Sequence, residues 1–138
     1  MPENLMTGGR LSAAVEIGGH SSNALDIELV EASPSVLASD LFGLGQAVAL
    51  NEDGTPNSPE SAAAGGSTVR LELTGTGGQK IAATVGGLPA EVVSARALPG
   101  LGRTELTIRI PPGVTGAAAV RIQAGEAFSQ SGVWISTR

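Results

Sequence analysis

The chain has 138 residues, a net charge of −5, one histidine, and no cysteine or tyrosine. The side chains that most often serve as nucleophiles, general bases and metal ligands are almost missing, which argues against an enzyme and against a bound cofactor. A disulfide framework is excluded, and no apolar run is long enough to span a bilayer. The scattered basic residues lack interleaved aromatics, which argues against a nucleic-acid partner.

The charges are unevenly distributed along the chain. Residues 1–66 carry nine acidic residues and one basic residue, whereas residues 67–138 carry four acidic and seven basic residues. The simpler interpretation is that these charges lie on solvated strand faces. The alternative is that an acidic half and a basic half dock against each other, within the chain or between neighbouring modules.

The N-terminal third contains one expected hairpin. Residues 1–10 are polar, and we expect a flexible leader. Residues 11–33 are expected to form a β-hairpin, with strands at 14–17 and 25–29 joined by a glycine-rich turn. Residues 119–136 repeat this plan, which fits a chain that begins with the last hairpin of a partial preceding module. A lone hairpin is marginal in water, so we expect it to pack on the body or swap onto a neighbour.

The next segment, residues 34–66, is expected to be a linker strand and a polar loop. Pro34 removes a backbone donor and marks a linker. A short helical or irregular turn is expected at 36–41 and a strand at 46–50. Residues 51–66 are rich in Asn, Pro, Ser and Gly, which is typical of a loop.

From residue 67 onward, short segments alternate apolar and polar side chains, as in Val69-Arg70-Leu71-Glu72-Leu73. This is the period-2 pattern of half-buried strands, and Gly and Pro turns separate the segments. We predict an all-β fold in which residues 67–138 form an immunoglobulin-like antiparallel β-sandwich with a thin core of small aliphatic side chains. The expected strands are 67–74, 80–85, 90–96, 103–110, 118–123 and 132–137.

Several of the punctuating motifs follow a familiar order and spacing. They are residues 43–59 (GLGQAVALNEDGTPNSP), 66–69 (GSTV), 74–77 (TGTG), 84–92 (TVGGLPAEV), 99–101 (PGL) and 106–114 (LTIRIPPGV). In these motifs the chain, from about residue 12 to 138, resembles the Solibacter-type uncharacterised C-terminal domain found at the ends of large bacterial secreted proteins. The resemblance implies a pair of IPT/TIG-like, immunoglobulin-type β units that are exported and have no established activity.

The best candidate for a metal site is the loop at residues 49–60. Aligned with a twelve-residue calcium loop, five oxygen-bearing residues occupy positions three, five, seven, nine and twelve. The first position is Ala49, which removes a principal ligand. We therefore expect a structural loop made of two tight turns, with calcium binding no tighter than about millimolar. The five candidate ligands are Asn51, Asp53, the Thr55 carbonyl, Asn57 and Glu60.

His20, Ser21, Ser22 and Asp26 contain the ingredients of a hydrolytic triad. All four lie on one expected hairpin, where a nucleophile, a base and an orienting carboxylate rarely converge beside an oxyanion hole. The favoured interpretation is a solvated turn histidine.

Trp134 is the single tryptophan and lies in the last expected strand. Two interpretations are open: a sugar-stacking platform, or a plug in the core between the sheets. We favour the core, because carbohydrate modules usually offer several exposed aromatics and this chain has only Phe42, Phe128 and Trp134.

These observations favour a non-catalytic, immunoglobulin-like structural or interaction module of an exported or cell-surface bacterial protein. It would act as a spacer, an anchor or an adhesion platform, with a signal peptide that is not in this chain. The expected partners are proteins or neighbouring modules of the same polypeptide, and cell-surface polysaccharide. The alternatives are a carbohydrate- or calcium-binding module and, more distantly, a hydrolase.

Overall fold

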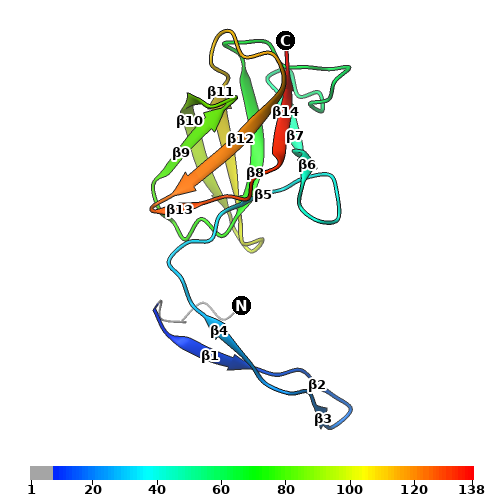
Figure 1. Ribbon diagram of the computed structural model, residues 1–138, viewed down its shortest axis with the longest axis vertical. Helices are drawn as coiled ribbons and strands as arrows, with labels where there is room; N and C mark the ends of the chain where they lie inside the picture. The colour runs from blue at the N-terminus through cyan, green and yellow to red at the C-terminus, as the bar shows by residue number, and fades with distance from the viewer. Residues whose placement is uncertain (1–7) are drawn as a thin grey trace. The chain divides into compact units, whose positions relative to one another are not determined.

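The computed structural model describes residues 8–138, and these residues form strands and turns without any helix. The all-β prediction is confirmed. The chain divides into two compact units, one ending at Glu31 and the other spanning Ala32–Arg138 (Figure 1). Residues 1–7 of the expected leader lie outside the described residues.

The first unit is a two-part hairpin. Strand β1 (Arg10–Ala13) pairs antiparallel with β4 (Leu25–Glu28), and β2 (Glu16–Ile17) pairs with β3 (His20–Ser21) at the tip. The pairing of 14–17 with 25–29 is therefore wrong, because the partner of β4 is β1. The tip is a two-residue turn at Gly18 and Gly19, both at positive φ, and this tight turn fixes the register there.

Residues 8–10, expected as part of the leader, belong to this hairpin. The Gly8 amide donates to the Leu29 carbonyl over 2.9 Å, and β1 begins at Arg10. The hairpin is therefore longer at its open end than the sequence pattern indicates. Its polar residues there continue the ladder through backbone hydrogen bonds, which do not require apolar side chains.

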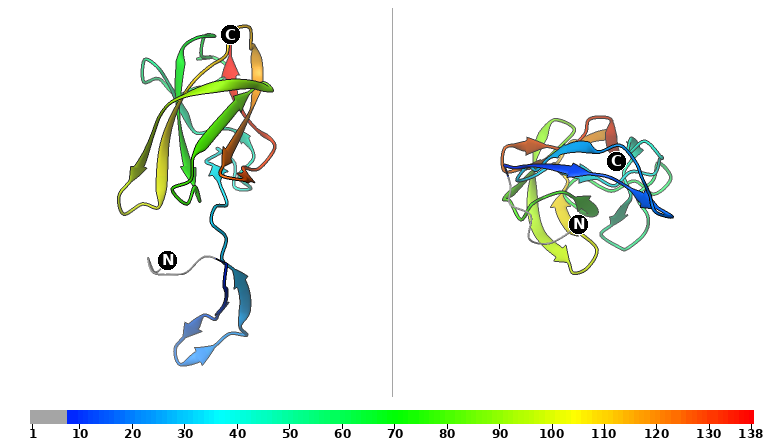
Figure 2. Two further views of the ribbon diagram at one scale, coloured as in Figure 1. Left: turned by 90° about the vertical axis from the view of Figure 1, so that its left-hand side faces the viewer. Right: turned by 90° about the horizontal axis from the view of Figure 1, so that it is seen from below.

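The second unit is built on one continuous, curled sheet. Its strands run in the spatial order β5-β8-β11-β10-β9-β12-β14-β6, with β7 also paired to β8 and β13 to β12. The pairs are antiparallel except for β14 with β6, which is parallel. Figure 2 shows how these strands curve into a half-barrel. The strands are β5 (Ser35–Val36), β6 (Gly45–Gln46), β7 (Ala49–Asn51), β8 (Thr68–Thr74), β9 (Ile81–Val85), β10 (Leu88–Leu98), β11 (Arg103–Arg109), β12 (Gly116–Ala124), β13 (Ala127–Phe128) and β14 (Val133–Thr137).

The sheet bends at β10. Residues 88–90 of this strand pair with β9, whereas residues 91–98 pair with β11. The register shifts between Val92 and Ser94, and such a bulge bends and twists a strand. One strand therefore belongs to both halves of the sheet.

The segment 34–66 contributes three strands to this unit. Of the two forms expected at 36–41, the helical turn is absent: Ser35–Val36 pairs with β8, Ala38 bridges to Ala47, and the rest of this stretch is irregular. The expected strand at 46–50 is divided in two, because β6 pairs with β14 whereas β7 pairs with β8. The compact unit thus begins well before residue 67, and side chains of this segment fill part of the core: Val36, Ala47, Ala49 and Ala63.

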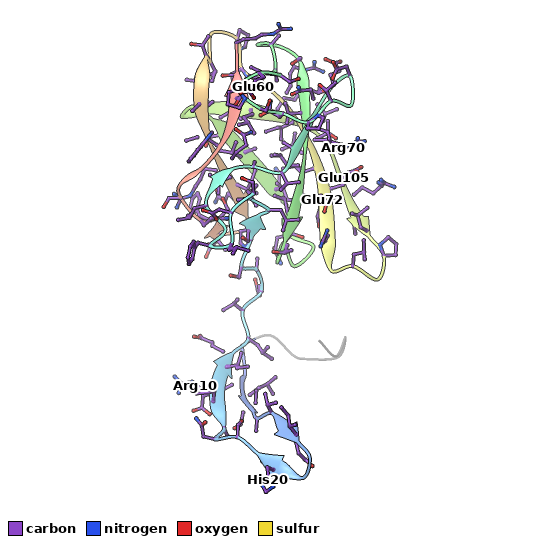
Figure 3. The ribbon with its side chains drawn as sticks, turned by 90° about the vertical axis from the view of Figure 1, so that its right-hand side faces the viewer. Arg10, His20, Glu60, Arg70, Glu72 and Glu105 are labelled. Carbon is purple, nitrogen blue, oxygen red and sulfur yellow. The ribbon has the colours of Figure 1, made fainter. Side chains whose placement is uncertain are left out.

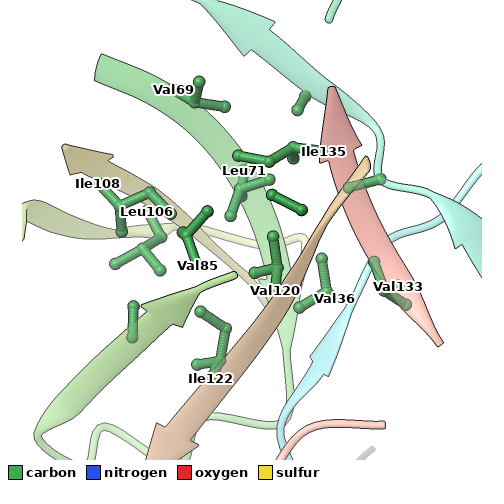
Figure 4. Close-up of a cluster of buried hydrophobic side chains, with 14 of the residues drawn as sticks. Val36, Val69, Leu71, Val85, Leu106, Ile108, Val120, Ile122, Val133 and Ile135 are labelled. Atoms are coloured by element: carbon green, nitrogen blue, oxygen red, sulfur yellow. The ribbon is translucent and has the colours of Figure 1, made fainter. Parts of the chain in front are cut away.

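The core is filled by aliphatic side chains from the inner faces of the strands (Figure 4). Along β8, Val69, Leu71 and Leu73 are fully buried while Arg70 and Glu72 point outward. Strands β11 and β12 alternate in the same way, and β14 does so over its first three residues, so the period-2 pattern identified these inward positions correctly. The buried set holds no aromatic side chain: it is Val36, Ala47, Ala49, Ala63, Val69, Leu71, Leu73, Ala83, Val85, Leu106, Ile108, Ile110, Val114, Ala118, Val120, Ile122, Val133 and Ile135.

Candidate functional site

The loop at 51–60 is held by hydrogen bonds among its own polar groups. The Thr55 amide and hydroxyl both donate to Asp53 Oδ1, over 3.0 and 2.7 Å. Those bonds from Thr55, the hydroxyl first and the amide second, lower the pKa of the Asp53 carboxyl from its ordinary value. Gly54, at a φ of 85°, closes the turn by donating its amide to the Asn51 carbonyl.

Asn57 is buried and links this loop to the last strand. Its Nδ2 donates to Asn51 Oδ1 and to the Ser136 carbonyl, each over 2.8 Å. Its Oδ1 accepts from the Ser136 amide over 2.7 Å and from Gln46 Nε2 over 2.8 Å. The amide therefore has both donors and both acceptor positions engaged, and its oxygen is not free to bind an ion.

Four of the five candidate calcium ligands are joined by hydrogen bonds among themselves: Asn51, Asp53, Thr55 and Asn57. Asn51 donates through Nδ2 to the Ser61 carbonyl over 2.8 Å, and Glu60, labelled in Figure 3, is one of the residues that line an open cavity of about 540 Å³. No group of three or more His, Cys, Asp or Glu side chains within residues 8–138 is placed to hold a metal ion. The residues present do not fit a calcium loop, because Asp53 Oδ1, the Thr55 carbonyl and Asn57 Oδ1 already accept hydrogen bonds from protein donors. The cavity is lined by Asn51, Glu52, Asp53, Glu60, Ala63, Arg138 and their neighbours.

Of the residues of the hypothetical triad, His20 lies at the tip of the first unit (Figure 3). Ser22 Oγ accepts from the Val15 amide over 3.0 Å and donates to the Asn23 carbonyl over 2.8 Å, so it closes the local turn. Asp26 lies opposite Ser12 in the ladder. Among the hydrogen bonds of the described residues, none joins His20 to Ser22 or Asp26. The arrangement lacks the geometry that a triad requires.

Trp134 does not plug the core, so that interpretation is wrong. Its neighbours Val133 and Ile135 are buried, whereas the Trp134 side chain is 38% exposed on the outer face of β14. The physical reason is the alternation itself, which sends Trp134 outward once Val133 and Ile135 point inward.

Other side chains extend this outer face. Trp134 is paired with Ala119 of β12, and Arg121 lies two residues further along that strand. The Arg121 guanidinium is 5.4 Å from the centroid of the Phe128 ring, which is 56% exposed on β13. We call the surface formed by Ala119, Arg121, Phe128 and Trp134 the aromatic face.

A different surface covers β8, β10 and β11, where charged side chains alternate in sign. Glu72 pairs with Arg103 at 2.9 Å, and Glu105 pairs with Arg96 at 3.0 Å and with Arg70 at 3.9 Å (Figure 3). Glu91 and Arg109 add a further pair at 2.8 Å. We call this the charged face. Most of its side chains are at least a third exposed, so each pair contributes at most about 1 kcal/mol to stability.

Two glutamines with structural roles escaped the sequence analysis. Gln130 Oε1 accepts from the Val36 amide over 3.0 Å, and its Nε2 donates to the carbonyls of Val36 and Gly43 over 2.6 and 3.0 Å. Gln46 Oε1 accepts from Ser136 Oγ over 3.0 Å, and Gln46 Nε2 donates to Asn57 Oδ1 over 2.8 Å. The Gln130 amide takes the place of a partner strand along the backbone of Val36. Val36 and Ser136 are each about 90 residues away in the chain from the glutamine that they contact, and no local pattern signals such a bond.

Comparison with known proteins finds no relative of this chain. No family model, no curated protein and no solved structure matches the chain. Within residues 8–138 there is also no helix long and apolar enough to cross a membrane.

Proposed function

We propose that residues 32–138 are an immunoglobulin-type, non-catalytic interaction module of an exported or cell-surface bacterial protein. The observation that carries the fold assignment is the strand order. Immunoglobulin constant-type domains place strands A, B, E and D in one sheet and C, F and G in the other. Here β5-β8-β11-β10 are followed by β9-β12-β14. Seven of these strands take the letters A to G in chain order: β5, β8, β9, β10, β11, β12 and β14. With β6 and β7 as extra pieces of A, and with the short β13 given no letter, they have that order.

The non-catalytic part of the proposal is supported by how the polar side chains are used. The charged face neutralises itself by cross-strand ion pairs. Three side-chain amides form hydrogen bonds that join the segment before β8 to the last strand and to the loop before it. They belong to Asn57, Gln46 and Gln130. Every one of these groups has a structural partner, which is the behaviour of a scaffold.

The aromatic face is the surface we assign to the partner. Tryptophan and arginine are enriched at the energetic centres of protein interfaces, and this face combines Trp134, Phe128 and Arg121 with the small Ala119. The charged face has its charges already paired and offers little to a partner. Export and a bacterial origin rest on the resemblance to secreted C-terminal domains. The partner would be another surface protein or a neighbouring module.

This function is tested by binding the labelled chain to fractions of the bacterium that encodes it. We expect retention on the cell-surface fraction rather than the cytosolic one, with a loss of at least tenfold for Trp134→Ala. Glu72→Gln, on the charged face, is the matched control and should bind as the unaltered chain does. Equal retention of all three proteins, or retention only on the cytosolic fraction, would contradict the proposal.

A carbohydrate ligand is the second candidate, because two exposed rings, Trp134 and Phe128, lie on one outer face. Calorimetric titration with soluble bacterial surface polysaccharide distinguishes it from a protein partner. Heat that disappears with Trp134→Ala would favour the carbohydrate. Retention on surface fractions after treatment with glycosidase, and its loss after protease, would favour the protein.

A further inference from the structure

Asp53 and Gly54 form the single Asp-Gly pair of the chain, and the sequence has no Asn-Gly pair. In an Asp-Gly pair the glycine nitrogen can attack the aspartate side chain, because glycine has no Cβ to hinder the approach. The nitrogen bonds to Cγ and gives up its proton. One carboxyl oxygen leaves as water with that proton and the carboxyl proton, and a five-membered succinimide ring remains. Water then reopens the ring at either carbonyl carbon, giving aspartate or isoaspartate, in which the main chain runs through Cβ and Cγ.

The pair lies on the exposed turn that follows β7. Both residues are exposed to solvent, and a Cβ added to Gly54 would meet no other atom. Packing therefore neither keeps water away from Asp53 nor limits the movement of Gly54. The restraint on this reaction must come from the hydrogen bonds of the loop.

The first restraint acts on the attacking nitrogen. The Gly54 amide donates to the Asn51 carbonyl over 2.9 Å, which closes a four-residue turn. Neither Glu52 nor Asp53 has a positive φ, so the turn is of type I, in which ψ of the third residue, Asp53, is about 0°. Viewed along the Cα–C bond of Asp53, the Gly54 nitrogen is then eclipsed with the backbone nitrogen of Asp53. The succinimide ring needs it eclipsed with Cβ instead, so this bond must rotate before the ring can close.

The second restraint acts on the side chain that is attacked. The amide and the hydroxyl of Thr55 both donate to Asp53 Oδ1, over 3.0 and 2.7 Å. These two bonds span the same Cα–C bond, since the Asp53 side chain lies before it and Thr55 lies after it. Rotation toward the ring therefore changes the position of both donors relative to Oδ1. Such a local side-chain bond stabilises the turn against other backbone conformations.

Isoaspartate at position 53 would change how the loop is held. It lengthens the main chain by one atom inside the hairpin that starts at β7. In this hairpin the Asn51 amide donates to the Thr55 carbonyl over 2.8 Å, and the Asn57 amide donates to the Ala49 carbonyl over 2.9 Å. Loop length fixes the register of such a ladder, so the extra atom displaces these bonds. Asn57 also joins the loop to β14, and the modified loop would be held less firmly there.

We propose that Asp53 and Gly54 are a site of isoaspartate formation that the folded loop restrains, with Thr55 as the positioning residue. The reaction needs no other reactant than water. It is slow while the turn from Asn51 to Gly54 is closed, and it becomes faster when the loop opens. This inference concerns the loop alone and does not depend on the partner proposed for the aromatic face.

Prolonged incubation of the full chain tests the proposal, with peptide mapping by mass spectrometry to distinguish aspartate from isoaspartate at position 53. The chain unfolded in guanidinium should form isoaspartate there several-fold faster than the folded chain. Thr55→Val removes the hydroxyl bond, and in the folded chain it should raise the rate several-fold. Thr55→Ser keeps both donors and should react as slowly as the unaltered chain. The fluorescence of Trp134 on β14 verifies that each variant is folded.

The matched control is Ser61→Ala. Ser61 Oγ contacts Thr55 Oγ1 over 3.1 Å and Asn51 Nδ2 over 3.2 Å, and neither contact involves Asp53. The substitution therefore removes two contacts from the same loop while both restraints stay in place. Its rate of isoaspartate formation should stay close to that of the unaltered chain.

The proposal fails if unfolding does not accelerate the reaction at position 53, a comparison that requires no variant. It also fails if folded Thr55→Val reacts no faster than the unaltered chain. Equal acceleration by Ser61→Ala would assign the effect to general loosening of the loop and would overturn the role of Thr55. A slower reaction in Thr55→Val would mean that the hydroxyl assists the attack by polarising the carboxyl group, and would equally overturn it.

Discussion

The two ends of the chain carry hairpins of the same pattern with different surroundings. In the β12–β14 hairpin, Val120, Ile122 and Ile135 are buried, and β12 also pairs with β9 while β14 pairs with β6. In the β1–β4 hairpin the corresponding apolar positions, Leu25 and Ile27, are exposed, and within the described residues β1 and β4 pair only with each other. Alternation of side chains therefore defines an apolar face, whereas flanking strands and an opposing layer decide whether that face is buried.

The largest expected effect compares one substitution in both hairpins. Ile122→Ala removes a fully buried side chain and should lower the free energy of unfolding by about 2–5 kcal/mol. Ile27→Ala, in the exposed hairpin, should change the unfolding of the second unit by less than about 0.5 kcal/mol. Urea denaturation followed by Trp134 fluorescence measures both. A large loss from Ile27→Ala would mean that the first hairpin is part of the cooperative core, and the contrast would disappear.

Glycines at positive φ sharpen the same contrast. Gly75 has a φ of 67°, and an added Cβ would overlap the backbone carbonyl of Ser33, whose amide donates to the Gly75 carbonyl over 2.8 Å. We expect Gly75→Ala to cost about 2–4 kcal/mol, because left-handed strain adds to a backbone clash. Gly19→Ala, at a φ of 78° with open space around it, is the control. It should leave the thermal unfolding of the second unit unchanged, and equal melting temperatures for both variants would contradict this account.

Buried polar contacts should behave in the same way on a smaller scale. Asn57→Ala removes an amide that bonds to Ser136, Asn51 and Gln46, and it takes away the acceptor of the buried Ser136 amide, whereas the Ser136 carbonyl keeps its bond from the Ala63 amide. We expect the free energy of unfolding to fall by about 1–3 kcal/mol. The control is Ser22→Ala, which removes exposed bonds in the first hairpin and should not change the stability of the second unit measurably. Amide hydrogen exchange at Ser136, faster in Asn57→Ala alone, checks the local cause.

The smallest effect is a pH dependence from Asp53. Its folded-state pKa lies below the ordinary value of 3.8 because of the bonds from Thr55. The resulting stabilisation is present above pH 3.8 and is lost as the pH falls through the lower, folded-state pKa. Thr55→Val should therefore lower the melting temperature slightly at neutral pH and converge with the unaltered protein in acid. A constant difference at every pH would show that the Asp53 carboxylate is not involved.

Calcium provides a direct check on the same loop. Since Asn57 and Asp53 already accept hydrogen bonds, we expect calorimetry to detect no calcium binding tighter than about millimolar. Micromolar binding that Asp53→Ala abolishes would reverse the structural interpretation of residues 51–60.

The residues that could be placed from the sequence were those governed by local pattern. Val69, Leu71 and Leu73 follow a strict alternation, and their inward orientation is as expected. Trp134 shows the limit of judging by residue type. Its position between the inward-facing Val133 and Ile135 indicates an outward side chain, whereas its apolar ring suggested the core. The candidate ligands Asn51 and Asn57 were chosen by spacing along the chain, but their bonds run to each other and to Ser136, which spacing cannot reveal.

The sequence by itself determined the all-β class, the inward positions of the long strands and the tight turns at glycine, because these depend on side-chain alternation and backbone sterics within a few residues. Only the tertiary structure decided that β5, β6 and β7 belong to the second unit, and that Gln130 and Asn57 fasten them to distant parts of the chain. Only the tertiary structure brought Trp134, Arg121 and Phe128 together on one face. Such contacts join residues far apart in the chain, so their energy is fixed by which strands become neighbours and not by local propensity.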